Sequence, residues 1–336
     1  MRRGLLLLCA VGVGLAAGAG WLGRAALREP LHLPEGGYIL EVPAGASLRS
    51  VTARLGEEGI LAHPRIVLTY GRISGMAGTI KAGEYQVVPG TTPTGLLHQL
   101  VEGKVRLHSL TIVEGWTTDD LMQAIRRHPA IRSAPPAAAG DVMEAAAGGA
   151  EHPEGWFFPD TYRFPRGITD EALLRMANER MKTVLERAWS GRGAGLPLRS
   201  PYEALILASI VEKETGLDRE RTRIAGVFVR RLQAGMRLQA DPTVIYGLGP
   251  AFDGNLTRRQ LAQDGPYNTY SRTGLPPTPI SLPGESSILA ALHPDDSDTL
   301  YFVASGEDDG SHVFSATLRE HNAAVKRYLA AAKVNE

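Results

Sequence analysis

The chain opens with a long run of apolar positions. Residues Gly4 to Leu22 carry no charge, and at about 1.5 Å of rise per residue a helix of this length just spans a hydrocarbon core of about 30 Å. Trp21 lies where an interfacial aromatic residue anchors a membrane helix, and two arginines stand on each side of the run. The pattern predicts that residues 1–28 form a cytoplasmic tip and a transmembrane signal anchor.

This anchor predicts a single-pass membrane protein with its N-terminus inside and the rest of the chain outside the cytoplasm. A cleaved signal peptide is the alternative, because small residues such as Ala17 and Ala19 offer a cleavage site. Lipid attachment at Cys9 is disfavoured, since Leu8 is the wrong kind of residue before a lipidated cysteine.

From residue 36 the pattern changes to short alternating segments. A strand is predicted at Tyr38–Val42, followed by a helix in which Leu48 and Leu55 recur at core spacing. Further strands and helices complete a small α+β module over residues 36–132. Its opening, "VPAGASLRSVTARLGEEGIL", is similar to a LysM glycan-binding repeat. Glycan binding by this module and a purely structural role are both open.

Residues 133–150 are rich in Ala, Pro and Gly and carry little patterning, so we predict a linker there. Residues 151–332 then form a denser domain with long amphipathic helices and turn-rich segments. One helix follows Ser200 as N-cap and Pro201 as first residue. The predicted fold class is α+β, with an N-terminal membrane helix, a small LysM-like α+β module and a larger α+β catalytic domain.

Composition narrows the function classes. Lys plus Arg and Asp plus Glu number 36 each among 336 residues, so nothing indicates a nucleic-acid partner. The only cysteine is Cys9, which excludes a disulfide framework and a cysteine-based metal site. The nine histidines are scattered, and neither H-E-x-x-H nor G-x-S-x-G occurs. We predict no metal and no cofactor.

The string "LASIVEKETG" places two carboxylates at the end of an apolar run. At about 100° per residue, Glu214 falls on the stripe of Leu207, Ile210 and Val211, whereas Glu212 points roughly to the opposite side. The two carboxyl groups therefore cannot serve one cleft as a pair.

Two effects are expected to raise the pKa of Glu214: burial beside apolar side chains, and the negative end of the helix dipole. A glutamic acid kept protonated near neutral pH suits general-acid cleavage of a glycosidic bond. The alternative is a partly exposed Glu that closes a helix and pairs with an arginine of the following "RERTR" segment.

Two later segments suit sugar binding. Gln239–Gly247 and Tyr267–Pro277 gather amide, hydroxyl and aromatic groups around Pro and Gly turns. Aromatic faces stack on sugar rings, and amides bond to hydroxyl and acetamido groups. Together with an extracytoplasmic location, they favour glycan chemistry.

Five strings, "EGWFFPDTY", "ASIVEKET", "VFVRRLQAGMRLQADPTVIYGLG", "YNTYSRTGLPP" and "HPDDSDTLYFVA", resemble the YceG-like family of endolytic murein transglycosylases. They run in family order through roughly Glu154 to Tyr328. The resemblance implies a membrane-anchored enzyme that cleaves within peptidoglycan strands, alongside cell-wall synthases of elongation. It implies that Glu214 is the catalytic residue, and that six residues line the cleft: Gln239, Asp241, Tyr246, Tyr267, Asn268 and Tyr270.

Such an enzyme needs only one acid, which protonates the bridging oxygen and then takes the proton of the muramic C6 hydroxyl to leave a 1,6-anhydro end. Amides such as Asn268 or Gln239 are expected to support the transition state. Two alternatives remain open: a glycoside hydrolase that pairs Glu214 with Asp241, and a non-catalytic glycan-binding scaffold of the cell-wall assembly.

Overall fold

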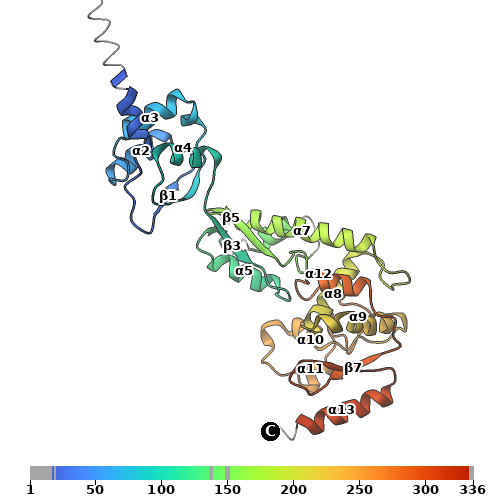
Figure 1. The fold of residues 1–336 in the computed structure, drawn as a ribbon. Coiled ribbons are helices and arrows are strands. Elements are labelled where there is room, and N and C mark those ends of the chain that lie inside the picture. Colours follow the sequence, from blue (N-terminus) through green and yellow to red (C-terminus); the bar gives the residue numbers. More distant parts are fainter. Residues whose placement is uncertain (1–16, 19, 136–138, 148–151, 333–336) are drawn as a thin grey trace, which may run out of the picture. The chain divides into compact units, whose positions relative to one another are not determined.

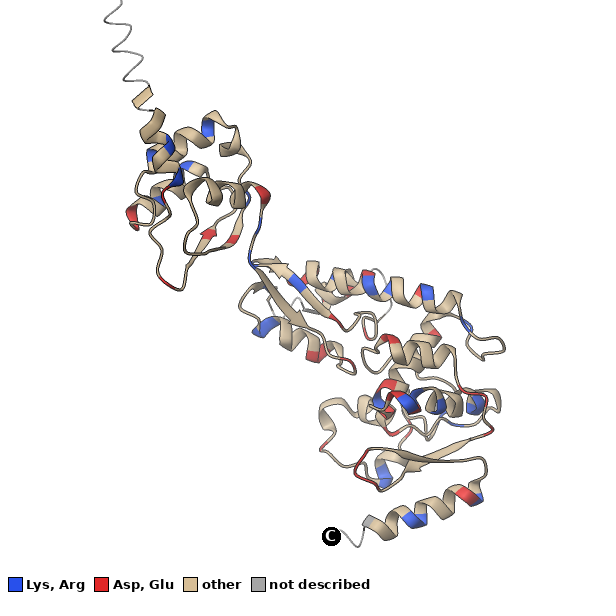
Figure 2. Cartoon of the chain, in the orientation of Figure 1, with Lys and Arg blue, Asp and Glu red and all other residues tan. Residues whose placement is uncertain are grey.

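The computed structural model describes residues 17–18, 20–135, 139–147 and 152–332, and its contacts divide the chain into two compact units (Figure 1). Unit 1 comprises Met1–His108 with Arg163–Gly167, and unit 2 comprises Ser109–Tyr162 with Ile168–Glu336. Helices and short strands occur in both units, so the protein is α+β, as predicted. Figure 2 shows acidic and basic residues dispersed over both.

Most of the predicted membrane span, Gly4–Leu22, lies outside the described residues. Among the residues that are described, no helix is both long enough and apolar enough to cross a bilayer.

Unit 1 is organised around one antiparallel pair of strands. Its elements are β1 (Tyr38–Val42), α2 (Leu48–Glu57), α3 (Pro64–Ile73), η1 (Met76–Gly78), β2 (Gly83–Val87) and α4 (Pro93–Glu102). The register sets Leu40 opposite Tyr85, and both side chains are fully buried. Ser47 caps α2 by accepting a hydrogen bond from the Ser50 N–H, as its position in the sequence predicts.

Unit 2 is larger and mainly helical. Its elements are β3 (Leu107–Thr111), α5 (Thr118–Arg127), β4 (Ile131–Arg132), α6 (Ala139–Ala146), β5 (Thr161–Pro165), β6 (Ile168–Thr169), α7 (Asp170–Ser190), α8 (Pro201–Glu214), α9 (Asp218–Gln233), α10 (Asp241–Leu248), η3 (Gly249–Ala251), α11 (Arg258–Ala262), α12 (Glu285–Leu292), β7 (Tyr301–Ala304), β8 (His312–Ser315) and α13 (Leu318–Ala332). The residues of β3 and β5 are divided between the two units. The strands pair in twos: β3 with β5, β4 with β6, and β7 with β8.

Helix α8 forms the centre of unit 2. Ser200 caps it by accepting from the Glu203 N–H, and Pro201 begins it, as predicted. Every residue from Ala204 to Val211 is buried, because α7, α9 and α12 pack around the helix. A helix that is apolar all round belongs in a core, so its last turn is held in place from several sides.

The contacts divide the chain between His108 and Ser109, whereas the sequence pattern places a linker at 133–150. Within that stretch, the alanine-rich residues form α6, which packs against α7 and buries Met143 and Ala146. Alanine is the strongest helix former, so an alanine-rich segment needs little patterning to become a helix. Residues 136–138 and 148–150 of the stretch lie outside the described residues.

A second difference concerns the segment predicted as turn-rich. The string "DPTVIYGL" forms α10, with Pro242 as its second residue. Proline is tolerated in the first turn of a helix, where its missing N–H has no helical partner. The helix fixes the orientation of Asp241 and Tyr246, which a flexible loop would not.

Truncation inside α8 should be costly. Ile210 is fully buried in the main cluster of unit 2, and Ile210→Ala is expected to lower the free energy of unfolding by about 2–5 kcal/mol. Leu289→Ala on α12 is the matched control, because Leu289 is 40% exposed. Urea denaturation measures both variants, and an equal loss for the two would contradict the central position of α8.

Candidate active site

The two carboxyl groups of the "EKET" string face different partners. Glu212 is almost fully buried: its Oε2 accepts the Gly284 N–H at 2.9 Å, and its Oε1 lies 3.6 Å from Arg221. One turn earlier, Ser209 accepts the Ile280 N–H at 3.0 Å. The segment 280–284 is thus hydrogen-bonded along one side of α8. The arginine of "RERTR" therefore pairs with Glu212 and not with Glu214.

Glu214 is the last residue of α8, since the backbone becomes extended at Thr215. It lies two residues, about 200° of helical turn, from Glu212. Its side chain is partly buried. Among the described residues no hydrogen bond to its carboxyl group forms, so the group is available to a ligand.

The pKa of Glu214 is raised to about 8. Burial is the larger cause, and the negative charge of Asp241 adds to it. The positive charge of Arg231 acts in the opposite direction. Burial was expected from the sequence. The second cause, the negative charge of Asp241 on α10, was not expected. An acid with this pKa is largely protonated at neutral pH.

Arg231 is a fixed cation beside Glu214. It is buried on α9, where Nε donates to the Leu300 carbonyl at 2.7 Å and Nη1 donates to the Leu238 carbonyl at 2.6 Å. Burial lowers its pKa, and the charge of Glu214 is among the effects that raise it. Because two backbone carbonyls hold the guanidinium, its charge stays near the carboxyl group without a direct ion pair.

Asp241 and Tyr270 meet in the same environment. The Tyr270 hydroxyl donates to the Asp241 carboxylate. Burial raises the pKa of Tyr270, and this hydrogen bond raises it further. The structure therefore brings together three residues predicted to act at one site: Glu214, Asp241 and Tyr270.

Gln239 lies two residues before Asp241. It is exposed and has a backbone φ of 51°, the one positive φ of a non-glycine residue in the described part of the chain. Its N–H donates to the Thr269 carbonyl at 3.1 Å. The Thr269 side chain also accepts the Ala240 N–H at 3.0 Å. These bonds tie the two segments predicted to bind sugar to each other.

Asn268 has a different place from the one predicted. It is 5% exposed, and its amide nitrogen lies within hydrogen-bond distance of three carbonyls, those of Gln260, Leu261 and Gln263. Its oxygen accepts the N–H groups of Tyr270 and Ser271. With both ends of the amide engaged, Asn268 braces the loop that carries Tyr270, and it has no polar atom to spare for a transition state.

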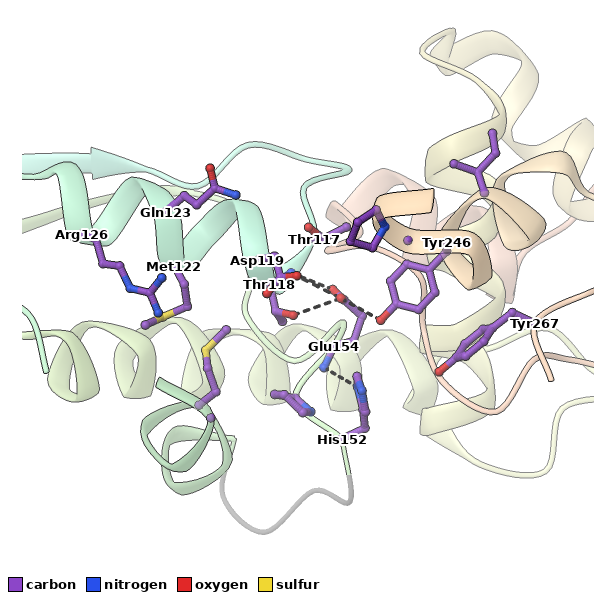
Figure 3. A pocket seen from close by; sticks show the side chains of 16 residues that line it. Thr117, Thr118, Asp119, Met122, Gln123, Arg126, His152, Glu154, Tyr246 and Tyr267 are labelled. Carbon is purple, nitrogen blue, oxygen red and sulfur yellow. Dashed lines mark hydrogen bonds between the residues drawn. The ribbon is translucent and has the colours of Figure 1, made fainter. Parts of the chain in front are cut away.

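Tyr246 and Tyr267 lie in a second group, together with a residue that was not predicted (Figure 3). Their rings meet edge to face, with centroids 5.0 Å apart. The Tyr246 hydroxyl donates to Glu154 Oε2 at 3.1 Å. Glu154 is 1% exposed and also accepts the N–H and hydroxyl of Thr118. No short-range pattern reveals this site, because Tyr246 lies 92 residues from Glu154.

Two buried acids therefore compete for the role of proton donor. Burial raises the pKa of Glu154 to about 7, against the hydrogen bonds from Tyr246, Thr118 and Gly155 that lower it. Those donors occupy the carboxyl oxygens of Glu154. The carboxyl group of Glu214 makes no such bonds among the described residues, so Glu214 is the better placed of the two to protonate a ligand.

Metal ligation was not predicted from the sequence. In the described ranges, no three His, Cys, Asp or Glu side chains gather closely enough to hold a metal ion.

Comparisons with known proteins point in one direction. The family model described as "YceG-like family" matches residues 40–327. An endolytic murein transglycosylase of Bacillus subtilis is 29% identical over 94% of this chain and 91% of its own length. One from Streptococcus pneumoniae is 26% identical over 86% of this chain and 58% of its own length. The crystal structure of a YceG-like protein from Listeria monocytogenes matches with a TM-score of 0.51 and 30% identity, covering 86% of this chain and 99% of that one.

The raised pKa of Glu214 should be visible as pH-dependent stability. An unfolded glutamate ionises near 4.5, whereas the folded protein holds this proton to about pH 8. The protonated carboxyl group therefore contributes its full share of folding stability below pH 4.5. This contribution is lost as the pH rises from 4.5 toward 8. Glu214→Gln removes the titration, so it should stabilise the protein progressively relative to wild type between pH 5 and pH 8.

The difference should grow by at most about 1.4 kcal/mol per pH unit, measured by urea denaturation at pH 5, 6.5 and 8. Glu186→Gln, which changes an exposed carboxyl group on α7, serves as the control. A Glu214→Gln difference that stays constant across this range would contradict the raised pKa.

Proposed function

The chain belongs to the YceG-like family, and from this premise we propose that it is an endolytic lytic transglycosylase that cleaves peptidoglycan strands. Peptidoglycan lytic transglycosylases are lyases, so the bond is broken without water. The names of the bacterial relatives support this activity. The observation that carries the proposal is Glu214, a lone carboxyl group with a pKa of about 8 and no hydrogen-bonded partner among the described residues.

We propose that Glu214 acts first as acid and then as base. It donates its proton to the oxygen between N-acetylmuramic acid and N-acetylglucosamine, and that C1–O bond breaks. The carboxylate then accepts the proton of the muramic C6 hydroxyl, whose oxygen bonds to C1 and closes a 1,6-anhydro ring. The proton count is unchanged over the cycle, so one group suffices.

The neighbours of Glu214 suit the two halves of this cycle. The charge of Asp241 favours the protonated form that begins the reaction, and Arg231 favours the carboxylate that exists midway. The Tyr270 hydroxyl holds Asp241 in place. We infer that Gln239, exposed beside Asp241, and the tyrosine pair Tyr246 and Tyr267 contact the glycan.

The proximity of Asp241 also favours a second candidate function. A glycoside hydrolase uses two carboxyl groups, about 5 Å apart or about 6.5–9.5 Å apart, with water as the acceptor. Asp241 acts on the pKa of Glu214 through its charge and is therefore near enough to be considered. In this alternative the new chain end is a reducing sugar and not an anhydro sugar.

We further propose that residues 1–28 anchor the protein in the inner membrane, with unit 2 on the periplasmic side. The apolar run and its flanking arginines support this location. We also propose that residues 36–132 contain a LysM-like module, a proposal supported by the order strand, helix, helix, strand in β1, α2, α3 and β2. We further propose that the cleavage terminates or trims nascent glycan chains and that the protein works alongside cell-wall synthases of elongation.

Glu214→Gln should abolish strand cleavage. The amide cannot donate and recover a proton, so the rate should fall by at least about 10²-fold. Mass analysis of digested glycan strands gives the readout, because anhydro ends weigh one water less than reducing ends. Glu186→Gln, which changes an exposed carboxyl group on α7, is the control and should leave cleavage unchanged. Unchanged cleavage by folded Glu214→Gln would favour a non-catalytic scaffold.

Asp241→Asn should separate the two candidate reactions. Removing its charge lowers the pKa of Glu214, so the alkaline limb of the kcat/KM profile should move to lower pH while anhydro ends are still produced. An asparagine oxygen can still accept the Tyr270 hydroxyl. If wild type yields reducing ends and the variant yields no cleavage, the two-carboxylate hydrolase is the correct mechanism.

A further inference from the structure

Unit 2 contains a cavity of about 780 Å³, and of its lining residues the proposed function uses only Tyr246 and Tyr267. It is lined by α5, by α6, by the stretch 152–154, by α10 with η3, and by Tyr267. Glu214 does not line it. Its volume lies in the range typical of ligand sites. Figure 3 shows the labelled side chains arranged in a row, from Arg126 past Glu154 to Tyr267.

One face of α5 forms a wall of this cavity. Asp119, Met122, Gln123 and Arg126 all line it, and their spacing of i, i+3, i+4 and i+7 puts them on the same side of a helix. The opposite charges of Asp119 and Arg126 stand about 10 Å apart along the axis, at 1.5 Å per residue. In the described part of the chain, neither side chain forms an ion pair.

Glu154 fixes the middle of the cavity. Its oxygens accept from Thr118 at the start of α5 and from Tyr246 on α10. The Glu154 N–H donates to His152 Nδ1 at 3.2 Å. These bonds hold the charged wall and the tyrosine wall in a fixed relation. Such a preorganised site loses little entropy when it binds a ligand.

Helix α10 connects this cavity with the candidate active site. Asp241, at the first position of α10, acts on Glu214, and Tyr246, five residues later, lines the cavity. Five residues of helix correspond to about 7.5 Å along the axis. A ligand in the cavity therefore contacts the same short helix that carries Asp241, whose charge acts on Glu214.

We propose that this cavity binds the peptide stem of a muramic acid residue near the scissile bond, with a stem carboxylate on Arg126 and a stem amine on Asp119. The inference rests on the proposed function. In strands that carry stems, the lactyl carboxyl group of each muramic acid is amidated, so the sugar backbone offers no charged partner for either side chain, whereas an elongated peptide with both charges does. Met122 and the tyrosine rings suit its aliphatic parts.

The test compares two substrates with the full-length protein in detergent: glycan strands with intact stems, and the same strands stripped of stems by an amidase and then capped as methylamides at the lactyl carboxyl groups that the amidase frees. Wild type should cleave intact strands faster. Arg126→Glu should lower kcat/KM on intact strands about tenfold and leave kcat/KM on stripped strands unchanged. Arg126→Gln should show the same selective loss to a smaller extent. It keeps the test valid if the Arg126→Glu variant misfolds. Arg327→Glu, exposed on α13, should change neither rate.

Arg126 also stands in the last turn of α5, where a cation stabilises the helix dipole, and the acidic residues stand in the first turn (Figure 2). If Arg126 served only the helix, its variants would lower the melting temperature and lose activity equally on both substrates. That outcome, or equal cleavage of intact and stripped strands by wild type, overturns the inference. If wild type yields no anhydro ends from either substrate, the proposed function itself fails.

Discussion

The polar contacts between α8 and the segment 280–284 determine what the end of α8 can do. A helix that is buried on all sides has no polar face that must point to solvent. Specific hydrogen bonds must therefore set its rotation about its own axis. Ser209 and Glu212, one turn apart, provide them by accepting backbone N–H groups from Ile280 and Gly284. Once Glu212 is committed to that side, Glu214 has to face the other way, toward α9 and α10.

The arrangement around Glu214 is a balance of opposed charges in a partly buried place. Burial and Asp241 hold the proton on the acid, while Arg231 keeps the ionised state accessible. Arg231 is anchored to the carbonyls of Leu238 and Leu300, so it cannot collapse onto the carboxylate and neutralise it permanently. A proton that must leave and return requires this kind of balance, because either extreme would stop one half of a cycle.

The sequence predicts local structure well and the partners of buried polar groups poorly. Helix geometry acts over a few residues. It accounts for the N-caps Ser47 and Ser200, for Pro201 at the start of α8, and for the opposed directions of Glu212 and Glu214. The bonds from Glu154 to Thr118 and Tyr246 span 36 and 92 residues, and only tertiary structure reveals them. Asn268 was expected to contact ligand on its residue type alone. A side-chain amide can equally well bond to backbone groups and stabilise a loop. The number of carbonyls near the amide decides between loop stabilisation and ligand binding.

Gln239 has a left-handed backbone conformation, and this affects which amino acid suits the position. A left-handed backbone conformation costs a non-glycine residue roughly 1–2 kcal/mol, and glycine would adopt the observed φ of 51° without that cost. For folding alone, glycine would be the better residue. An exposed amide beside Asp241 in this conformation is typical of local strain kept at a functional site. Screening for heat resistance and screening for turnover would therefore select different amino acids at this position.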